Sequence, residues 1–167
     1  MVLVVDPDRA AAGRLLALLH GAGLATRAIP SADELSSAVS EGPACVLADL
    51  DLPGGAALLE EVGRSGAHLP VIFRTRSSDV RAAVRAMKAG AADILLEPLD
   101  GEQLAAAARL ALERAAHAWT HRAEIERTRT SFASLTPSEK AVAALVARGL
   151  LSKQIAARLG VVEQTIR

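Results

Sequence analysis

Five short apolar segments alternate with amphipathic stretches along the first 100 residues, and this alternation limits the folds open to the chain. Short apolar runs bounded by turn residues are typical of buried strands, and the stretches between them have helical spacing. This order predicts an α/β fold, a (βα)₅ unit with a five-stranded parallel sheet and helices on both faces. The expected strands cover 2–5, 25–29, 45–47, 71–74 and 94–96.

Acidic residues follow the first and third of these strands. Asp49 and Asp51 end the central strand just before a Pro53-Gly54-Gly55 turn, and Asp6 ends the first strand. In open parallel sheets, chemistry gathers at the carboxyl ends of the strands. Asp49 therefore suits a nucleophile or a metal ligand, or it simply solvates a strand end. Asp6 also suits the N-cap of the helix that follows Pro7.

Charge is unevenly distributed, although the 19 basic and 19 acidic residues balance overall. Residues 1–116 contain 11 Lys and Arg against 15 Asp and Glu, whereas residues 117–167 contain 8 against 4. The basic part is the one expected to meet a polyanion such as nucleic acid. The single Cys45 excludes an intramolecular disulfide, fits a reducing cytoplasm, and favours a core residue over a redox sensor. No apolar run is long enough for a membrane span, so no membrane partner is expected.

Four further helices are expected within and just after this unit. A capping box opens one at Ser31, another surrounds Leu58, and a third runs from the N-cap Asp79 to Lys88. A long fourth helix starts near Gly101, and its seam suits either a dimerising coiled coil or an amphipathic linker. His117, His121 and Glu124 on this helix are better explained as a solvated face than as a metal site. The seam residues are Leu104, Ala108, Ala111, Ala115, Ala118, Arg122 and Ile125.

The pattern changes after residue 134. Thr136-Pro137-Ser138-Glu139 is a strong helix start, and Gly149 ends that helix. A short helix over 152–159 ends at Gly160, and a third helix is expected from Val161. Short helices joined by glycine-containing turns suit a helix-turn-helix.

Residues 1–100 resemble the receiver domain of bacterial response regulators, especially those of the FixJ type. The resemblance lies in Asp6, in Asp49 with Pro53 four residues on, in the PVIFRT run ending at Thr75, and in MKAGAADILLEPL. Residues 135–167 resemble the start of a LuxR-type DNA-binding domain. The resemblance implies a flavodoxin-like receiver over 1–116, a linker helix extension over 117–134, and an incomplete helix-turn-helix over 135–167.

The resemblance also implies a mechanism, that of a regulator and not of an enzyme. A sensor histidine kinase would phosphorylate Asp49 with the help of Mg²⁺, held by Asp49, Asp6 and the backbone carbonyl of Asp51. Thr75 would then act as the switch and reshape the face formed by the fourth helix, fifth strand and fifth helix. That face would form a homodimer and pair the DNA-binding parts.

Two departures from the family pattern alter this expectation. Pro7 stands where the family has a second metal-binding acid, which Asp8 replaces in part, and Glu97 stands where the family has a lysine. A carboxylate at about 4 Å from a phosphoryl charge costs several kcal/mol per unit charge at an effective dielectric near 20. We therefore expect an atypical receiver, phosphorylated weakly or not at all. The alternative is a pseudo-receiver that binds a partner protein without phosphorylation.

The DNA-binding end also departs from its family. Val162 stands where the recognition helix usually has a Ser or Thr cap, and the sequence ends at Arg167 within that helix. Gln164, Thr165 and Arg167 are expected to face DNA, with Lys153 on phosphates, and the fragment is expected to bind DNA poorly.

An enzymatic alternative rests on one triplet. Phosphatases of the haloacid dehalogenase type use an Asp-x-Asp like Asp49-x-Asp51, but a triplet arises easily by chance and Glu97 has the wrong charge. A flavin-binding sheet is disfavoured by the lack of a Ser/Thr-rich phosphate loop.

Overall fold

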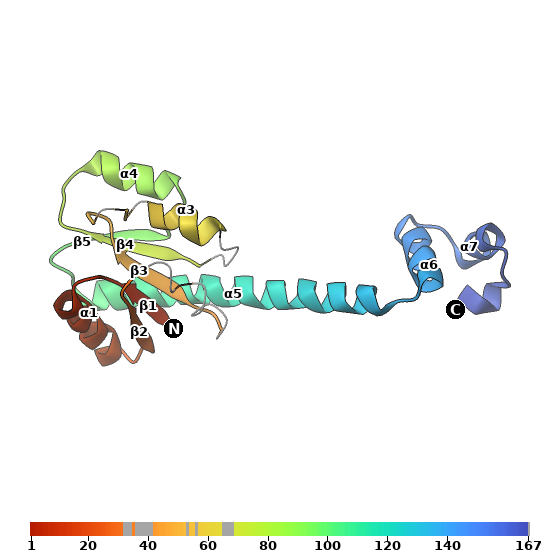
Figure 1. The fold of residues 1–167 in the computed structure, drawn as a ribbon, viewed down its shortest axis with the longest axis horizontal. Helices are drawn as coiled ribbons and strands as arrows, with labels where there is room; N and C mark the ends of the chain where they lie inside the picture. The colour runs from red at the N-terminus through yellow and green to blue at the C-terminus, as the bar shows by residue number, and fades with distance from the viewer. Residues whose placement is uncertain (32–34, 36–41, 53, 56, 65–68, 167) are drawn as a thin grey trace. The chain divides into compact units, whose positions relative to one another are not determined.

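The computed structural model describes residues 1–31, 35, 42–52, 54–55, 57–64 and 69–166, and it divides the chain into two compact units, Met1–His121 and Arg122–Arg167. The first unit contains a five-stranded parallel sheet in the order β2-β1-β3-β4-β5 (Figure 1). The predicted parallel α/β fold is thereby confirmed. The strands are β1 (Val2–Val5), β2 (Thr26–Ile29), β3 (Cys45–Asp49), β4 (Val71–Thr75) and β5 (Asp93–Leu96).

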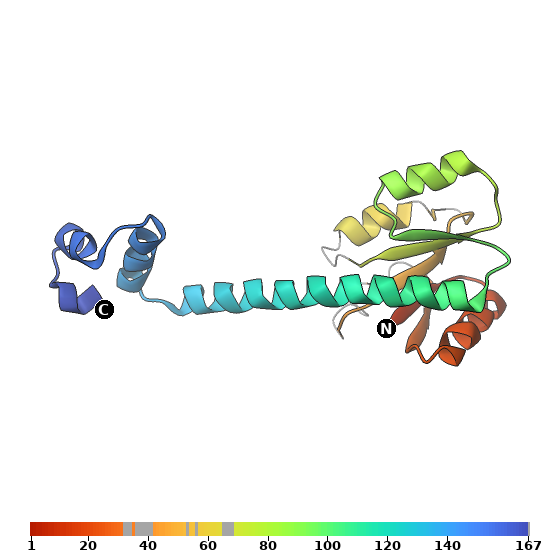
Figure 2. The ribbon, with the colours of Figure 1, turned by 180° about the vertical axis from the view of Figure 1, so that it is seen from behind.

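Helices cover both faces of this sheet (Figures 1 and 2). One face packs against α1 (Arg9–Gly21) and the first part of α5 (Gly101–Ser134), in a cluster that includes Leu19, Leu47 and Leu104. The other face packs against α3 (Ala57–Arg64) and α4 (Val80–Lys88). Because both faces are covered, the central strands are continuously apolar, without alternation, up to the polar residues at their carboxyl ends, Asp49 in β3 and Arg74 and Thr75 in β4.

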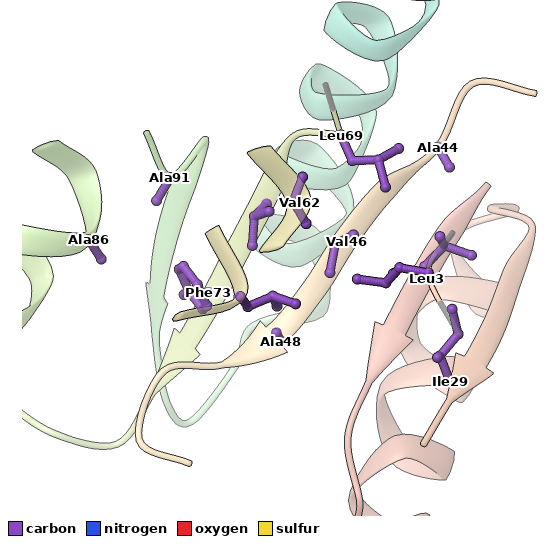
Figure 3. Packing of buried hydrophobic residues seen from close by; sticks show 13 residues of the cluster. Leu3, Ile29, Ala44, Val46, Ala48, Val62, Leu69, Phe73, Ala86 and Ala91 are labelled. Atoms are coloured by element: carbon purple, nitrogen blue, oxygen red, sulfur yellow. The ribbon is translucent and has the colours of Figure 1, made fainter. Parts of the chain in front are cut away.

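Phe73 of β4 is the largest fully buried side chain of the second face; it is the register partner of Ala48 and belongs to the same cluster as Val62 (Figure 3). Figure 3 shows small and branched side chains filling the rest of this layer, in keeping with the scarcity of aromatic residues in the sequence. This layer of the core is therefore stabilised by many small contacts between aliphatic side chains, with few contributions from aromatic rings.

Helix starts in this unit agree with the sequence in one case and differ in another. Asp79 caps α4 as predicted, accepting hydrogen bonds from the backbone N–H groups of Arg81 and Ala82. The predicted helix from Ser31 falls largely outside the described residues, where only Leu35 is seen and is buried. The N-cap of α1 differs from the prediction and is taken up with the site below.

Helix α5 is buried only along its first half. The seam residues Leu104, Ala108, Ala111 and Ala115 are buried, whereas Ala118, Arg122 and Ile125 are exposed. The heptad-like spacing thus serves the core of the first unit up to Ala115. The linker-or-dimer choice for the later turns stays a prediction.

The second unit contains α6 (Pro137–Ala147), α7 (Ser152–Leu159) and the 3₁₀ helix η3 (Glu163–Ile166). Thr136 and Glu139 form the predicted capping box of α6. Gly149 and Gly160 have φ values of 80° and 69°, a conformation in which glycine avoids the strain of a side chain. The third helix expected from Val161 is a single 3₁₀ turn, closed by the hydrogen bond from Thr165 N–H to the Val162 carbonyl.

Within the described residues, every helix falls short of the length and apolarity that a membrane crossing requires.

Candidate functional site at the carboxyl edge of the sheet

Asp6 and Asp49 lie side by side where β1 and β3 end. Val5 pairs with Ala48 in the parallel ladder, so the next residues along both strands emerge at the same edge. Both acids are buried, with only 5% of Asp6 and 4% of Asp49 exposed. Buried carboxylates need compensating partners, because an unpaired charge in a protein interior is strongly unfavourable.

Asp8, and not Asp6, is the N-cap of α1. Its Oδ1 accepts the hydrogen bond from the Ala10 N–H at 2.8 Å, whereas Asp6 Oδ1 accepts from the Asp8 N–H at 2.8 Å. The N-cap interpretation of Asp6 is therefore wrong, since the helix begins at Arg9, two residues later than predicted. Asp6 keeps its second oxygen for the site, and Pro7 is exposed and supplies no carboxylate.

The loop after β3 is tied to the end of β4. Asp49 Oδ1 accepts from the Asp51 N–H at 2.8 Å. Asp51 in turn accepts from the Thr75 hydroxyl at 2.8 Å and from the Arg76 N–H at 2.7 Å. These bonds, the Arg76 N–H first and the Thr75 hydroxyl after it, outweigh desolvation and lower the pKa of Asp51. Thr75, the predicted switch residue, is itself buried.

Arg74 is the residue that brings the acids together. Its Nη2 lies 2.7 Å from Asp6 Oδ2 and 2.8 Å from Asp49 Oδ2, and its Nη1 donates to Glu97 Oε1. The residue is 8% exposed and lies in the wall of a cavity of about 370 Å³ that Asp6, Asp49 and Glu97 also line. Three carboxylates from the ends of three strands thus share one guanidinium.

The charge environment of Arg74 favours its protonated form. Burial by itself lowers the pKa of the guanidinium, but the hydrogen bond to Glu97, the charge of Asp49 and the hydrogen bond to Asp6 raise it above its ordinary value. Its Nε is buried and has no hydrogen-bond partner among the described residues. The ion pairs with the carboxylates therefore position this side chain, although one of its N–H groups, at Nε, is left without an acceptor.

Sequence reasoning missed Arg74, although a signal was present. A charged residue within a strand that is otherwise Val, Ile and Phe is rare unless it is paired. The two-residue period of a strand places Arg74 on the same face as Ile72, opposite Phe73, and at the edge where Asp6 and Asp49 end their strands. These two observations together point to a buried ion pair with the strand-end acids.

The donor set does not fit the magnesium ion that the resemblance implies. Each oxygen of the two predicted carboxylate ligands, Asp6 and Asp49, already has a partner, a backbone N–H on Oδ1 and Arg74 on Oδ2. Asp8, the partial replacement for the missing acid, is engaged in capping α1. The role predicted for the Asp51 backbone carbonyl stays a prediction, and the Asp51 side chain accepts from Thr75 and Arg76. The described part of the chain holds no group of three His, Cys, Asp or Glu side chains placed to bind a metal.

The predicted DNA-contacting residues lie in the second unit. Lys153 is exposed on α7, and Gln164 and Thr165 are exposed in η3. Arg167 lies outside the described residues. The first three side chains are exposed and thus accessible to a ligand, and their contact with DNA stays a prediction.

Two other candidates have structural roles. Cys45 is buried in β3, and burial raises the pKa of its thiol to about 11, which suits a core residue and not a redox sensor. His117, His121 and Glu124 are all exposed on α5, in agreement with a solvated face.

Two family descriptions match the chain. Residues 2–109 match the "Response regulator receiver domain", and residues 133–167 match the "Bacterial regulatory proteins, luxR family". Among curated proteins, Nodulation protein W of Bradyrhizobium diazoefficiens is 36% identical over 170 residues, covering 100% of this chain and 75% of that protein. The transcriptional regulatory protein FixJ of Azorhizobium caulinodans is 36% identical over 168 residues, covering 99% of this chain and 80% of that protein.

Solved structures agree with these matches. The response regulator StyR superposes with a TM-score of 0.81 at 34% identity, covering 99% of this chain and 85% of that one. Full-length FixJ from B. japonicum superposes with a TM-score of 0.63 at 30% identity, covering 99% and 83%. The sheet order, the paired strand-end acids and these relatives together establish that the chain belongs to the bacterial two-component response regulators, with a receiver domain followed by a LuxR-type DNA-binding domain.

Proposed function

We propose that this response regulator controls transcription in the cytoplasm through a receiver whose Asp49 is phosphorylated weakly or not at all. A sensor histidine kinase is the partner expected for the family, and DNA is the expected target of the second unit. The similar proteins include a transcriptional regulatory protein and a response regulator, so a phosphatase interpretation of Asp49 and Asp51 has no support from their names.

One observation carries this proposal: Asp49 Oδ2 is held by the buried guanidinium of Arg74 at 2.8 Å. A carboxylate that attacks a phosphoryl group must present a free oxygen to it. Here Oδ1 accepts a backbone N–H and Oδ2 is in an ion pair. Glu97, in the place of the family's lysine, offers no positive charge to phosphoryl oxygens and is itself engaged with Arg74.

The output surface in this proposal is the face formed by α4, β5 and α5, acting as a homodimer interface. Its support is a set of exposed apolar side chains that a monomer leaves in water. On α4 and β5 these are Val80, Val84, Met87 and Leu96. The same side chains also favour the second candidate function, a pseudo-receiver that binds another protein through this face without phosphorylation.

The test is incubation of the full chain with Mg²⁺ and acetyl phosphate, or with beryllofluoride, followed by intact mass and size-exclusion chromatography. We expect little or no adduct of one phosphoryl group and an unchanged elution volume. Asp49→Asn is the control for adduct position. A stoichiometric adduct that is lost in Asp49→Asn, together with a change in oligomer, would overturn the proposal.

Val84→Glu and Met87→Glu distinguish the two uses of the α4–β5 face. If that face forms the homodimer, each variant elutes as a monomer where the parent chain elutes as a dimer. A parent chain that is monomeric at all concentrations favours the pseudo-receiver instead.

A further inference from the structure

We propose that Arg74 is a built-in cation that replaces a divalent metal ion at the acidic edge of the sheet, with Glu97 as its counter-charge. The inference rests on the proposed function in one respect, since it takes Asp6 and Asp49 as the receiver site. It goes further by naming the residue that makes this site independent of metal, and by treating positions 74 and 97 as one coupled change.

The position of the guanidinium excludes a shared metal ion. Magnesium binds carboxylate oxygens at about 2.0–2.1 Å. Nη2 lies 2.7 Å from Asp6 Oδ2 and 2.8 Å from Asp49 Oδ2, so it occupies the space between the two oxygens that a bridging ion requires. A metal ion enters only if the arginine side chain leaves.

The second terminal nitrogen of Arg74, Nη1, opposes departure of the side chain. Nη1 donates to Glu97 Oε1, and only 25% of the Glu97 side chain is exposed. The planar guanidinium holds acids on two of its nitrogens at once, a geometry that an ammonium group does not reproduce. Displacement by a metal ion would leave both Arg74 and Glu97 without their charged partners.

The chemistry at position 97 follows from the cation at position 74. A lysine at 97 would place a second positive charge against the guanidinium, whereas Glu97 neutralises it and anchors it. Pro7 fits the same account, because a cluster with its own cation has no need of a second metal-binding acid. The two departures seen in the sequence, Pro7 and Glu97, therefore belong with Arg74 to one rearranged site.

The test compares metal binding by the full chain and by variants at position 74. Arg74→Met keeps an unbranched side chain and removes the charge, and Arg114→Met makes the same change on the exposed face of α5 as a matched control. Mg²⁺ affinity is measured by isothermal titration calorimetry and by the rise in melting temperature in MgCl₂ against NaCl of equal ionic strength. We expect Arg74→Met to bind Mg²⁺ at least tenfold more tightly than the parent chain and Arg114→Met.

A second variant keeps the test decisive if Arg74→Met does not fold. Arg74→Met leaves three carboxylates without their cation, so Arg74→Met/Glu97→Gln removes one of these charges and is expected to fold with the same gain in Mg²⁺ affinity. The inference is overturned if the parent chain binds Mg²⁺ as tightly as the folded position-74 variants, or if those variants gain no affinity.

The proposed function and the role of Arg74 are overturned by different results. A stoichiometric phosphoryl adduct on the parent chain overturns the proposed function, whatever the metal affinities are. Equal metal affinities overturn the role of Arg74, even if the parent chain forms no adduct.

Discussion

Gly55 shows how closely the loop after β3 folds back on the residue that it follows. A Cβ atom built on Gly55 would lie 2.6 Å from the Asp49 carbonyl oxygen and 2.8 Å from that of Leu50. Both contacts are with backbone, which cannot swing away as a flexible side chain can. The path of the backbone at Asp49 and Leu50 thus depends on the absence of a side chain at Gly55.

Gly55→Ala is expected to lower the free energy of unfolding by about 1–3 kcal/mol, the usual cost of forcing atoms into a packed region. Gly13→Ala is the matched control, because a Cβ there meets nothing within 4 Å in the exposed interior of α1. That change is expected to stabilise by about 0.5–1 kcal/mol, since alanine is the better helix former. Urea unfolding followed by circular dichroism measures both, and equal effects of the two changes would contradict the close approach.

At the scale of elements, the second unit depends on local signals more than the first. Helix α6 has no buried residue, so tertiary packing contributes little to it and its capping box matters more. Thr136 Oγ1 accepts from the Glu139 N–H at 3.3 Å, and Glu139 Oε2 accepts from the Thr136 N–H at 2.7 Å. The backbone bond from Thr136, followed by its hydroxyl, lowers the pKa of Glu139.

Thr136→Ala is expected to destabilise α6 by about 1 kcal/mol through loss of the cap. Thr128→Ala is the control, because the Thr128 hydroxyl only donates to the Glu124 carbonyl one turn earlier within α5, a bond that adds little to helix stability. Since the pKa of Glu139 is lowered in the fold, its contribution is present above its unfolded pKa and is lost as the pH falls through the folded value. Helix content at pH 7 and pH 3 checks this, and a Thr136→Ala defect that is unchanged at pH 3 would argue against it.

At the scale of the whole molecule, both clusters of buried hydrophobic residues belong to the first unit. The cluster formed by β1, β3, α1 and α5 ends at Ala111, and the opposite cluster ends at Ala91, so neither includes a residue of the second unit. The buried residues of α5 likewise stop at Ala115. Stability of the receiver is therefore expected to be independent of residues beyond 121.

A chain of residues 1–121 should melt at the temperature of the receiver transition in the full chain. The measurement is thermal unfolding by calorimetry, with the full chain as the reference. A midpoint lower by more than about 5 °C, roughly 1 kcal/mol for a domain of this size, would show that the second unit contributes to receiver stability.

Much of this architecture could be predicted because its causes are local. The strand and helix order follows from apolar spacing, and the caps at Asp79 and Thr136 follow from a few neighbouring residues. Local signals misplaced the start of α1: the Asp-Pro pattern predicted an N-cap at Asp6, and the structure assigns the cap to Asp8. Residues Glu163–Ile166 form a 3₁₀ turn where the pattern predicted the start of an α-helix.

The sequence by itself determined that acids end the first and third predicted strands and that Glu97 stands where a lysine was expected. Only the tertiary structure decided what those charges do, because the partners of Arg74 lie 68 residues away at Asp6 and 23 residues away at Glu97. Coulomb attraction acts through space and in a poorly solvated edge it is strong, whereas sequence patterns report only neighbours along the chain. The expected conflict between Glu97 and the site is resolved by a guanidinium that joins both.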